Sequence, residues 1–281
     1  MDGVMSGRVV GVVLAVGLAA TACGNSVEVG LASAEATVAM VPATTTSTTT
    51  VAPSTPSSVA VSSTTSTTTS TTVPVDPHET FVANIIPSVA VLEAFDEPDG
   101  ELATFEYAIT NPTYFGHPLV LMVLDETDDG GWLKVQIPVR PNGTEAWIRS
   151  ADAEITSHRF HARIDLSDRS VVVWNGDDVV VQTGAVVGAE RTPTPVGSFF
   201  VNDLVEKWDG SAYGPYIWSL SAFSEALDSF GGGVPVIAIH GTNNPGLIGG
   251  AHSNGCIRIP NEAITILAQT VPMGTPVDIV T

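Results

Sequence analysis

A cysteine and a histidine near the C-terminus are the residues of this 281-residue sequence best suited to covalent chemistry. Cys256 follows His240 by sixteen positions. A thiol is mostly protonated at neutral pH, so a nucleophilic cysteine needs a nearby base, and the oxyanion formed by its attack needs hydrogen-bond donors. His240 can be the base. The backbone amides of Asn254, Gly255 and Cys256 can be the donors, because glycine permits a tight turn. The pair therefore predicts acyl transfer.

The flanking sequence predicts the elements that position these groups. Residues 234–239 form an apolar run, which indicates a buried strand ending at His240. The loop before Cys256 is rich in glycine, which argues against the alternative that this cysteine is only a small core residue. A helix follows, with Asn261 as its predicted N-cap and apolar residues recurring on one face.

Three segments resemble the L,D-transpeptidases of the YkuD type. The first joins His240-Gly241 to Ser-Asn-Gly-Cys-Ile-Arg at residues 253–258, similar to the Ser-His-Gly-Cys motif of the family. The second is Thr-Pro-Thr-Pro-Val-Gly-Ser-Phe at residues 192–199, and a weaker third is Gly-Pro-Tyr at residues 214–216. The segments occur in the family's order, and the resemblance covers about residues 159–281. It implies a mainly β fold, a YkuD-like β-sandwich with few helices.

The resemblance implies a peptidoglycan L,D-transpeptidase without a cofactor. Cys256 would attack the carbonyl of the third residue of a tetrapeptide stem, release the terminal D-alanine and form a thioester, with His240 moving the proton and the Gly241 carbonyl fixing the ring tautomer. An amine of a second stem would then form a cross-link between third residues. Attack by water instead would make the protein an L,D-carboxypeptidase. The expected substrate-binding residues are Tyr216, Trp218, Ser253 and Arg258.

One position departs from the family pattern, because Asn254 stands where the family has a histidine. His252, two residues earlier, is an alternative base, although the family uses the earlier histidine. The departure also leaves open a degenerate, non-catalytic wall-binding protein. Arg258 is expected either to pair with a stem carboxylate or to tie down its loop. A zinc site of His240, His252 and Cys256 is disfavoured because its spacing matches no common zinc motif, and no metal is expected.

The N-terminal region predicts secretion and anchoring. Residues 1–22 combine Arg8 with an apolar run too short to span a membrane, as in a signal peptide. Cys23 follows Ala-Thr-Ala and is the expected lipidation site of a lipoprotein, the alternative being an ordinary cleaved signal peptide. Residues 23–78 are dominated by Thr, Ser and Pro and predict a disordered stalk. We therefore expect an extracytoplasmic protein, anchored to the membrane through its lipid and located at the cell wall.

Two β domains are predicted after the stalk. In residues 79–157, apolar runs at 89–92, 105–109, 119–124 and 132–137 alternate with turn clusters, which indicates a small all-β domain. It weakly resembles a bacterial SH3-like module, with either a wall-binding or a spacer role. Residues 158–281 form the predicted catalytic domain, with strands near 160–166, 170–175, 179–184, 197–201 and 276–280.

Charge restricts the partners of the protein. The net charge is −20, and from Glu79 onward 26 acidic residues oppose 9 basic ones, which gives −17. Nucleic-acid binders are basic, so nucleic acid is excluded as a partner, and peptidoglycan stem peptides are the expected ligand. Neither cysteine is expected to form a disulfide. The remaining histidines are predicted to be surface or structural residues, and the sequence carries no signal of oligomeric state.

Overall fold

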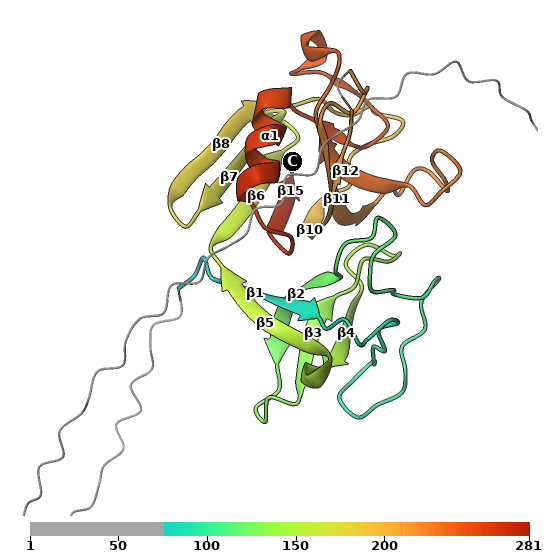
Figure 1. Ribbon diagram of the computed structural model, residues 1–281. Coiled ribbons are helices and arrows are strands. Elements are labelled where there is room, and N and C mark those ends of the chain that lie inside the picture. The colour runs from blue at the N-terminus through green and yellow to red at the C-terminus, as the bar shows by residue number, and fades with distance from the viewer. Residues whose placement is uncertain (1–75, 209) are drawn as a thin grey trace, which may run out of the picture. The chain divides into compact units, whose positions relative to one another are not determined.

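The computed structural model describes residues 76–208 and 210–281, and all of these belong to one compact unit. The predicted signal peptide, Cys23 and the stalk up to residue 75 lie outside the described residues. The described chain forms a five-stranded sheet and then an eight-stranded sheet (Figure 1). The first sheet ends at His158 and the second begins at Phe160.

The smaller sheet is antiparallel throughout and has the strand order β4-β3-β2-β1-β5. Its buried side chains, among them Leu121, Leu133 and Ile148, form a hydrophobic core of their own. Its SH3-like character stays a prediction. Its elements are β1 (Thr80–Ile85), β2 (Val120–Glu126), β3 (Trp132–Gln136), β4 (Glu145–Arg149), a 3₁₀ helix (Ser150–Asp152) and β5 (Ala153–His158).

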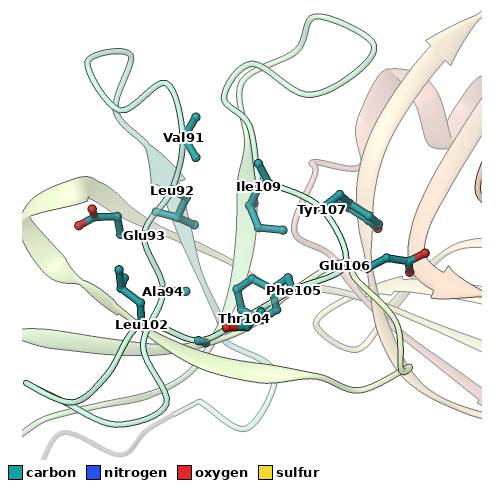
Figure 2. Close-up of a pocket in the computed structure, with 12 residues that line it drawn as sticks. Val91, Leu92, Glu93, Ala94, Leu102, Thr104, Phe105, Glu106, Tyr107 and Ile109 are labelled. Atoms are coloured by element: carbon teal, nitrogen blue, oxygen red, sulfur yellow. The ribbon is translucent and has the colours of Figure 1, made fainter.

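Two of the runs predicted as strands are wrong. Residues 89–92 and 105–109 are joined by a hydrogen bond from Leu92 to Ile109, and the isolated bridges at this place, Val91 with Thr110 and Phe95 with Leu102, involve residues beyond the runs. Another hydrogen bond joins the segments from Ala103 to Ala94. Between these two bonds one segment has a single residue and the other has five, so no regular ladder can form. The segments diverge around a cavity of about 490 Å³, into which apolar side chains point while the carboxylates of Glu93 and Glu106 point away (Figure 2).

The larger sheet has the strand order β14-β12-β11-β10-β15-β6-β7-β8. The pairs β12–β14 and β15–β6 are parallel, and the other neighbours are antiparallel. A separate parallel pair joins β9 to β13. The strands are β6 (Phe160–Asp165), β7 (Ser170–Asn175), β8 (Asp178–Gly184), β9 (Val187–Gly188), β10 (Gly197–Glu206), β11 (Tyr216–Phe223), β12 (Val236–His240), β13 (Ala251–Ser253), β14 (Ile257–Arg258) and β15 (Pro276–Val280).

One α-helix, α1 (Asn261–Thr270), lies against the larger sheet and buries Ile264 and Leu267 in its core (Figure 1). The prediction of Asn261 as N-cap is wrong by one position, because Pro260 occupies the N-cap and makes no side-chain cap bond. Asn261 Oδ1 instead accepts a 2.8 Å hydrogen bond from the amide of Thr242, which joins the helix start to the loop after β12. A 3₁₀ helix spans Pro245–Leu247. No helix in the described part of the chain is long and apolar enough to cross a membrane.

The two sheets share buried contacts. Phe200 of β10 is fully buried in the core of the smaller sheet. The side chain of Gln136 donates a 2.9 Å hydrogen bond to the carbonyl of Ser198 and accepts one of 3.0 Å from the hydroxyl of Ser221. Asn142 binds both the amide and the carbonyl of Phe223, each at 2.8 Å. The smaller sheet thus completes the hydrogen bonding of β10 and β11.

Candidate active site

The pairing of β12 with β14 brings Cys256 and His240 to one face of the larger sheet. His240 lies opposite Arg258, and Ile239 lies opposite Ile257. Paired residues point to the same face and side chains alternate along a strand, so Cys256, two residues before Arg258, shares the face of His240. The two are diagonal neighbours on adjacent strands, a separation that long side chains can bridge. The opposite face carries the core residues that pack beneath α1.

His240 is buried and held in one tautomer. Its Nδ1 lies 2.6 Å from the carbonyl oxygen of Gly241, which can only accept, so Nδ1 carries the proton and Nε2 keeps its lone pair. Burial lowers the pKa of His240 to about 4, with a smaller lowering by the charge of Arg258, while the bond to Gly241 opposes the shift. The ring is therefore neutral at pH 7 and available as a base. The ring of Tyr213 packs edge-on against it, 4.9 Å between centroids.

The thiol of Cys256 is protonated at rest. Burial raises its pKa, against smaller lowering effects of the Ala238 backbone and the Arg258 charge. Its Sγ lies 3.9 Å from the carbonyl oxygen of Val236, which begins the strand that ends at His240. The surroundings thus favour the neutral form of both groups, a thiol and an imidazole.

Arg258 places a positive charge beside this pair. Its backbone is fixed by two hydrogen bonds to Val186, of 2.8 and 2.9 Å. Its Nε is buried, and in the part of the chain that the structure describes it has no hydrogen-bond partner. Among the same residues the guanidinium forms no ion pair. The backbone holds the loop without help from the side chain, which leaves the guanidinium available to a carboxylate of a substrate.

In the loop before Cys256, the predictions for Gly255 as an oxyanion donor and for Ser253 as a substrate-binding residue are wrong. The amide of Gly255 is already bonded to the hydroxyl of Ser253 at 3.1 Å, so it is not an oxyanion donor. Ser253 is buried, and its hydroxyl donates to the carbonyl of Cys256 at 2.5 Å, so this residue shapes the loop and does not contact substrate. The amides of Asn254 and Cys256 have no acceptor within residues 76–208 and 210–281. These two amides remain as the candidate oxyanion hole.

Gly255 is required by the loop geometry. Its φ of +113° is strained for other residues, and a Cβ there would lie 2.8 Å from Cδ1 of Ile237. Asn254, which replaces the family's histidine, is exposed on this turn, and His252 is exposed on β13. His240 is therefore the histidine that the fold holds buried beside the nucleophile's strand.

Two threonines that the sequence had indicated only as part of a turn motif anchor the nucleophile loop. Thr194 donates from its hydroxyl to the carbonyl of Gly255 at 2.7 Å, and Thr192 donates to the carbonyl of Ser253 at 3.1 Å. The amide of Gly188 donates in turn to the hydroxyl of Thr194 at 2.9 Å. The Thr-Pro-Thr-Pro segment therefore fixes the loop that carries Cys256. In the sequence, the only sign of this role is the pair of threonine hydroxyls.

Replacing Thr194 with valine should weaken this anchor with little change in volume. The buried amide of Gly188 and the carbonyl of Gly255 would both lose a partner, so we expect a loss of stability of about 1–3 kcal/mol. We expect the acylation rate to fall about tenfold, because the amides beside Gly255 are no longer fixed. Thermal unfolding and the rate of carbapenem acylation measure the two effects. Serine at this position should restore most of both; an equal defect in the serine variant would contradict the role of the hydroxyl.

The two aromatic residues predicted to bind substrate do not lie on the face of the larger sheet that carries His240, called the catalytic face below. Trp218 is completely buried in the core, and Tyr216 packs partly buried against the same core. Both predictions are wrong for one reason: alternation along β11 turns residues 216 and 218 toward α1. Ile217 and Ser219 take the catalytic face instead, opposite His240 and Ala238. The aromatic residue that does contact the site is Tyr213, which sequence patterns did not identify.

The structure also bears on the zinc alternative. Within the described residues, no group of three or more His, Cys, Asp or Glu side chains is arranged to hold a metal ion. The exposed ring of His252 folds back over Gly250, where a Cβ would approach its Cδ2 within 2.4 Å. The site thus consists of a thiol, a neutral imidazole, two free amides and one guanidinium.

Comparisons with known proteins agree with the motifs. Residues 159–279 match the family model described as the YkuD L,D-transpeptidase catalytic domain. The protein named YkuD of Bacillus subtilis is 33% identical over 120 residues, which cover 43% of this chain and 65% of that protein. YkuD of Bacillus licheniformis is 35% identical over 120 residues, which also cover 43% of this chain and 65% of that protein. The match thus covers less than two thirds of these relatives' own length.

Similarity to solved structures is lower. An L,D-transpeptidase of Enterococcus faecium is 24% identical, with a TM-score of 0.34 over 43% of this chain and 49% of that one. An L,D-transpeptidase of Mycobacterium smegmatis is 15% identical, with a TM-score of 0.35 over 58% of this chain and 89% of that one.

Proposed function

We propose that this chain, whose residues 159–279 belong to the YkuD family of L,D-transpeptidase catalytic domains, cross-links peptidoglycan stem peptides through a thioester on Cys256. The observation that carries the proposal is the pairing of β12 with β14. In support, this pairing sets Ile257, the residue after Cys256, opposite Ile239, the residue before His240, whose neutral ring bonds through Nδ1 to the carbonyl of Gly241. A cysteine acyl-enzyme needs a thiol and a base with a free lone pair, and this pairing supplies both.

In the first half-reaction, Sγ of Cys256 attacks the carbonyl carbon of the third stem residue. The thiol proton passes to Nε2 of His240, and the new oxyanion accepts hydrogen bonds from the amides of Asn254 and Cys256. The bond between that carbonyl and the D-alanine nitrogen then breaks, and the proton on His240 moves to the leaving amine. A carboxylate of the stem can pair with Arg258, whose guanidinium is otherwise unpartnered among the described residues.

In the second half-reaction, a side-chain amine of another stem attacks the thioester carbonyl. A carbon–nitrogen bond forms as the carbon–sulfur bond breaks, and His240 carries the amine proton to the departing thiolate. The product joins the third residues of two stems, and free Cys256 returns. If water takes the place of the amine, the same steps release a tripeptide stem.

Carbapenem labelling tests the nucleophile. We expect intact-protein mass spectrometry to show one covalent adduct on the wild-type chain and none on Cys256→Ala, because a strained β-lactam carbonyl acylates a thiol that has a base and an oxyanion hole. Lack of an adduct on the folded wild-type protein at every pH would favour a non-catalytic wall-binding role. Incubation with tetrapeptide stems separates the two reactions: dimers joined through third residues support transfer, and tripeptides alone would leave only a carboxypeptidase.

We also propose that the chain is a lipoprotein outside the cytoplasmic membrane, attached through Cys23, with a stalk that spaces it toward the wall and ends before Asp76, because Asp76 and His78 pair with Arg159 and Asp177 of the folded part. The support is the signal-like sequence of residues 1–22 ending in Ala-Thr-Ala, directly before Cys23. Replacing Cys23 with serine should abolish incorporation of labelled palmitate and release the protein from the membrane fraction. Ser26→Ala, a change beside the same site that keeps the thiol, is the matched control and should label like wild type. Membrane retention of Cys23→Ser without label would contradict lipid anchoring.

A further inference from the structure

Two exposed aromatic rings stand on the loop that precedes β2. Tyr114 is 94% exposed and Phe115 is 48% exposed, and their rings meet edge to face with 5.1 Å between centroids. Isolated apolar residues on a surface are common, but two adjacent rings that contact each other and are left in water form a patch suited to a ligand.

The loop that carries these rings is fixed to the larger sheet. The hydroxyl of Thr113 donates to Oδ2 of Asp203 at 2.6 Å, and the ring of His117 binds Oδ1 of the same carboxylate. Asp203 belongs to β10 and is buried. A 2.8 Å bond from the amide of Thr113 to the carbonyl of His117 closes the turn around the two aromatic residues. The rings are therefore presented by a turn held at both of its ends.

The anchor of this loop lies on the same face of the sheet as the nucleophile. Asp203 pairs with Ser219, and Ser219 pairs with Ala238. The parallel register of β12 and β14 places Cys256 level with Ala238. Asp203, Ser219 and Ala238 form one row across β10, β11 and β12 and point to one face, and Cys256 precedes β14 at the level of this row. Three strand spacings separate Asp203 from Cys256, which is about 14 Å.

We infer that Tyr114 and Phe115 bind the glycan part of the substrate, an inference that rests on the proposed function. Three stem residues, from the carbonyl that Cys256 attacks back to the sugar, extend about 10 Å. The sugar that carries the stem then falls near the loop while the carbonyl is at the thiol. Sugar rings present flat faces of C–H groups that pack on aromatic rings, and the hydroxyl of Tyr114 can bond a sugar hydroxyl. A neutral glycan also meets no repulsion from this acidic protein.

Binding to the full-length Cys256→Ala chain, which cannot turn over, tests the inference by calorimetry. The probes are a disaccharide tetrapeptide and the free tetrapeptide. Replacing both Tyr114 and Phe115 with alanine should raise the Kd for the disaccharide tetrapeptide about tenfold and leave the Kd for the free tetrapeptide unchanged. The ring-keeping double change Tyr114→Phe with Phe115→Tyr should stay near wild type, and Phe81→Ala, which removes an exposed ring on β1, is the matched control.

Equal weakening of both probes, no weakening of either, or no binding of the disaccharide probe would each overturn the inference. The double alanine variant in an otherwise wild-type chain should keep its carbapenem acylation rate, which shows that the catalytic face is intact. If the wild-type chain forms no adduct and processes no stem, the proposed function fails. The comparison of the two probes still decides where the sugar binds.

Discussion

Serine in place of Cys256 is expected to lower the rate constant of acylation by on the order of 10⁴-fold or more. A hydroxyl is a far weaker acid than a thiol, and His240, whose pKa burial lowers to about 4, is too weak a base to activate it. Time courses of carbapenem adduct formation by mass spectrometry measure the effect, together with turnover of tetrapeptide stems.

Cys256→Ala is the control for this experiment and should form no adduct, because alanine offers no nucleophile. Both variants should keep the wild-type unfolding temperature within a few degrees, because the side chain is only half-buried and its one sulfur contact is long. A serine variant that acylates within tenfold of wild type would show that another group activates the nucleophile, and the assignment of His240 would be wrong.

Replacing His240 with glutamine should lower the acylation rate about 10³-fold between pH 5 and pH 8. In the wild-type chain the base form exists above its pKa, so the rate should rise as pH passes about 4 and should show no inflection near 6.5. In the variant the rate should follow the thiolate fraction, which becomes appreciable only at alkaline pH because burial raises the pKa of Cys256. The two profiles should therefore converge as the pH rises.

A His252→Gln variant provides the matched control, because His252 is exposed while His240 is buried. It should keep the wild-type rate and pH profile. If His252→Gln reproduced the loss while His240→Gln did not, the base would be the other histidine, which was the alternative left open by the sequence.

The sequence predicted the strand, loop and helix around His240 and Cys256 because their signals were local, whereas β11 was not predicted. The apolar run before His240 was short, and the turn before Cys256 was marked by glycines, so strand, loop and helix could each be placed from their own residues. The mainly β class follows from the same alternating runs and is confirmed by the described strands.

The errors have a different cause, because each concerns strand pairing or hydrogen bonding that cannot be read from the local sequence. Trp218 and Tyr216 were assigned to the substrate because they are aromatic, but the face of β11 to which they point is set by its partner strands. The amide of Gly255 was assigned to the oxyanion hole, but the hydroxyl of Ser253 takes it. Before the smaller sheet's second strand, residues 89–92 and 105–109 have the composition of strands. The segments have unequal numbers of residues between their shared hydrogen bonds, and the sequence does not reveal this mismatch.

The burial of Phe200 in the core of the smaller sheet has a consequence for how the chain folds. Phe200 lies inside residues 159–279, yet its hydrophobic stabilisation comes from side chains contributed by residues before 150. We therefore expect residues 159–279 to be less stable when excised than in the full chain, because excision would expose a phenylalanine and leave the partners of Gln136 without their hydrogen bonds.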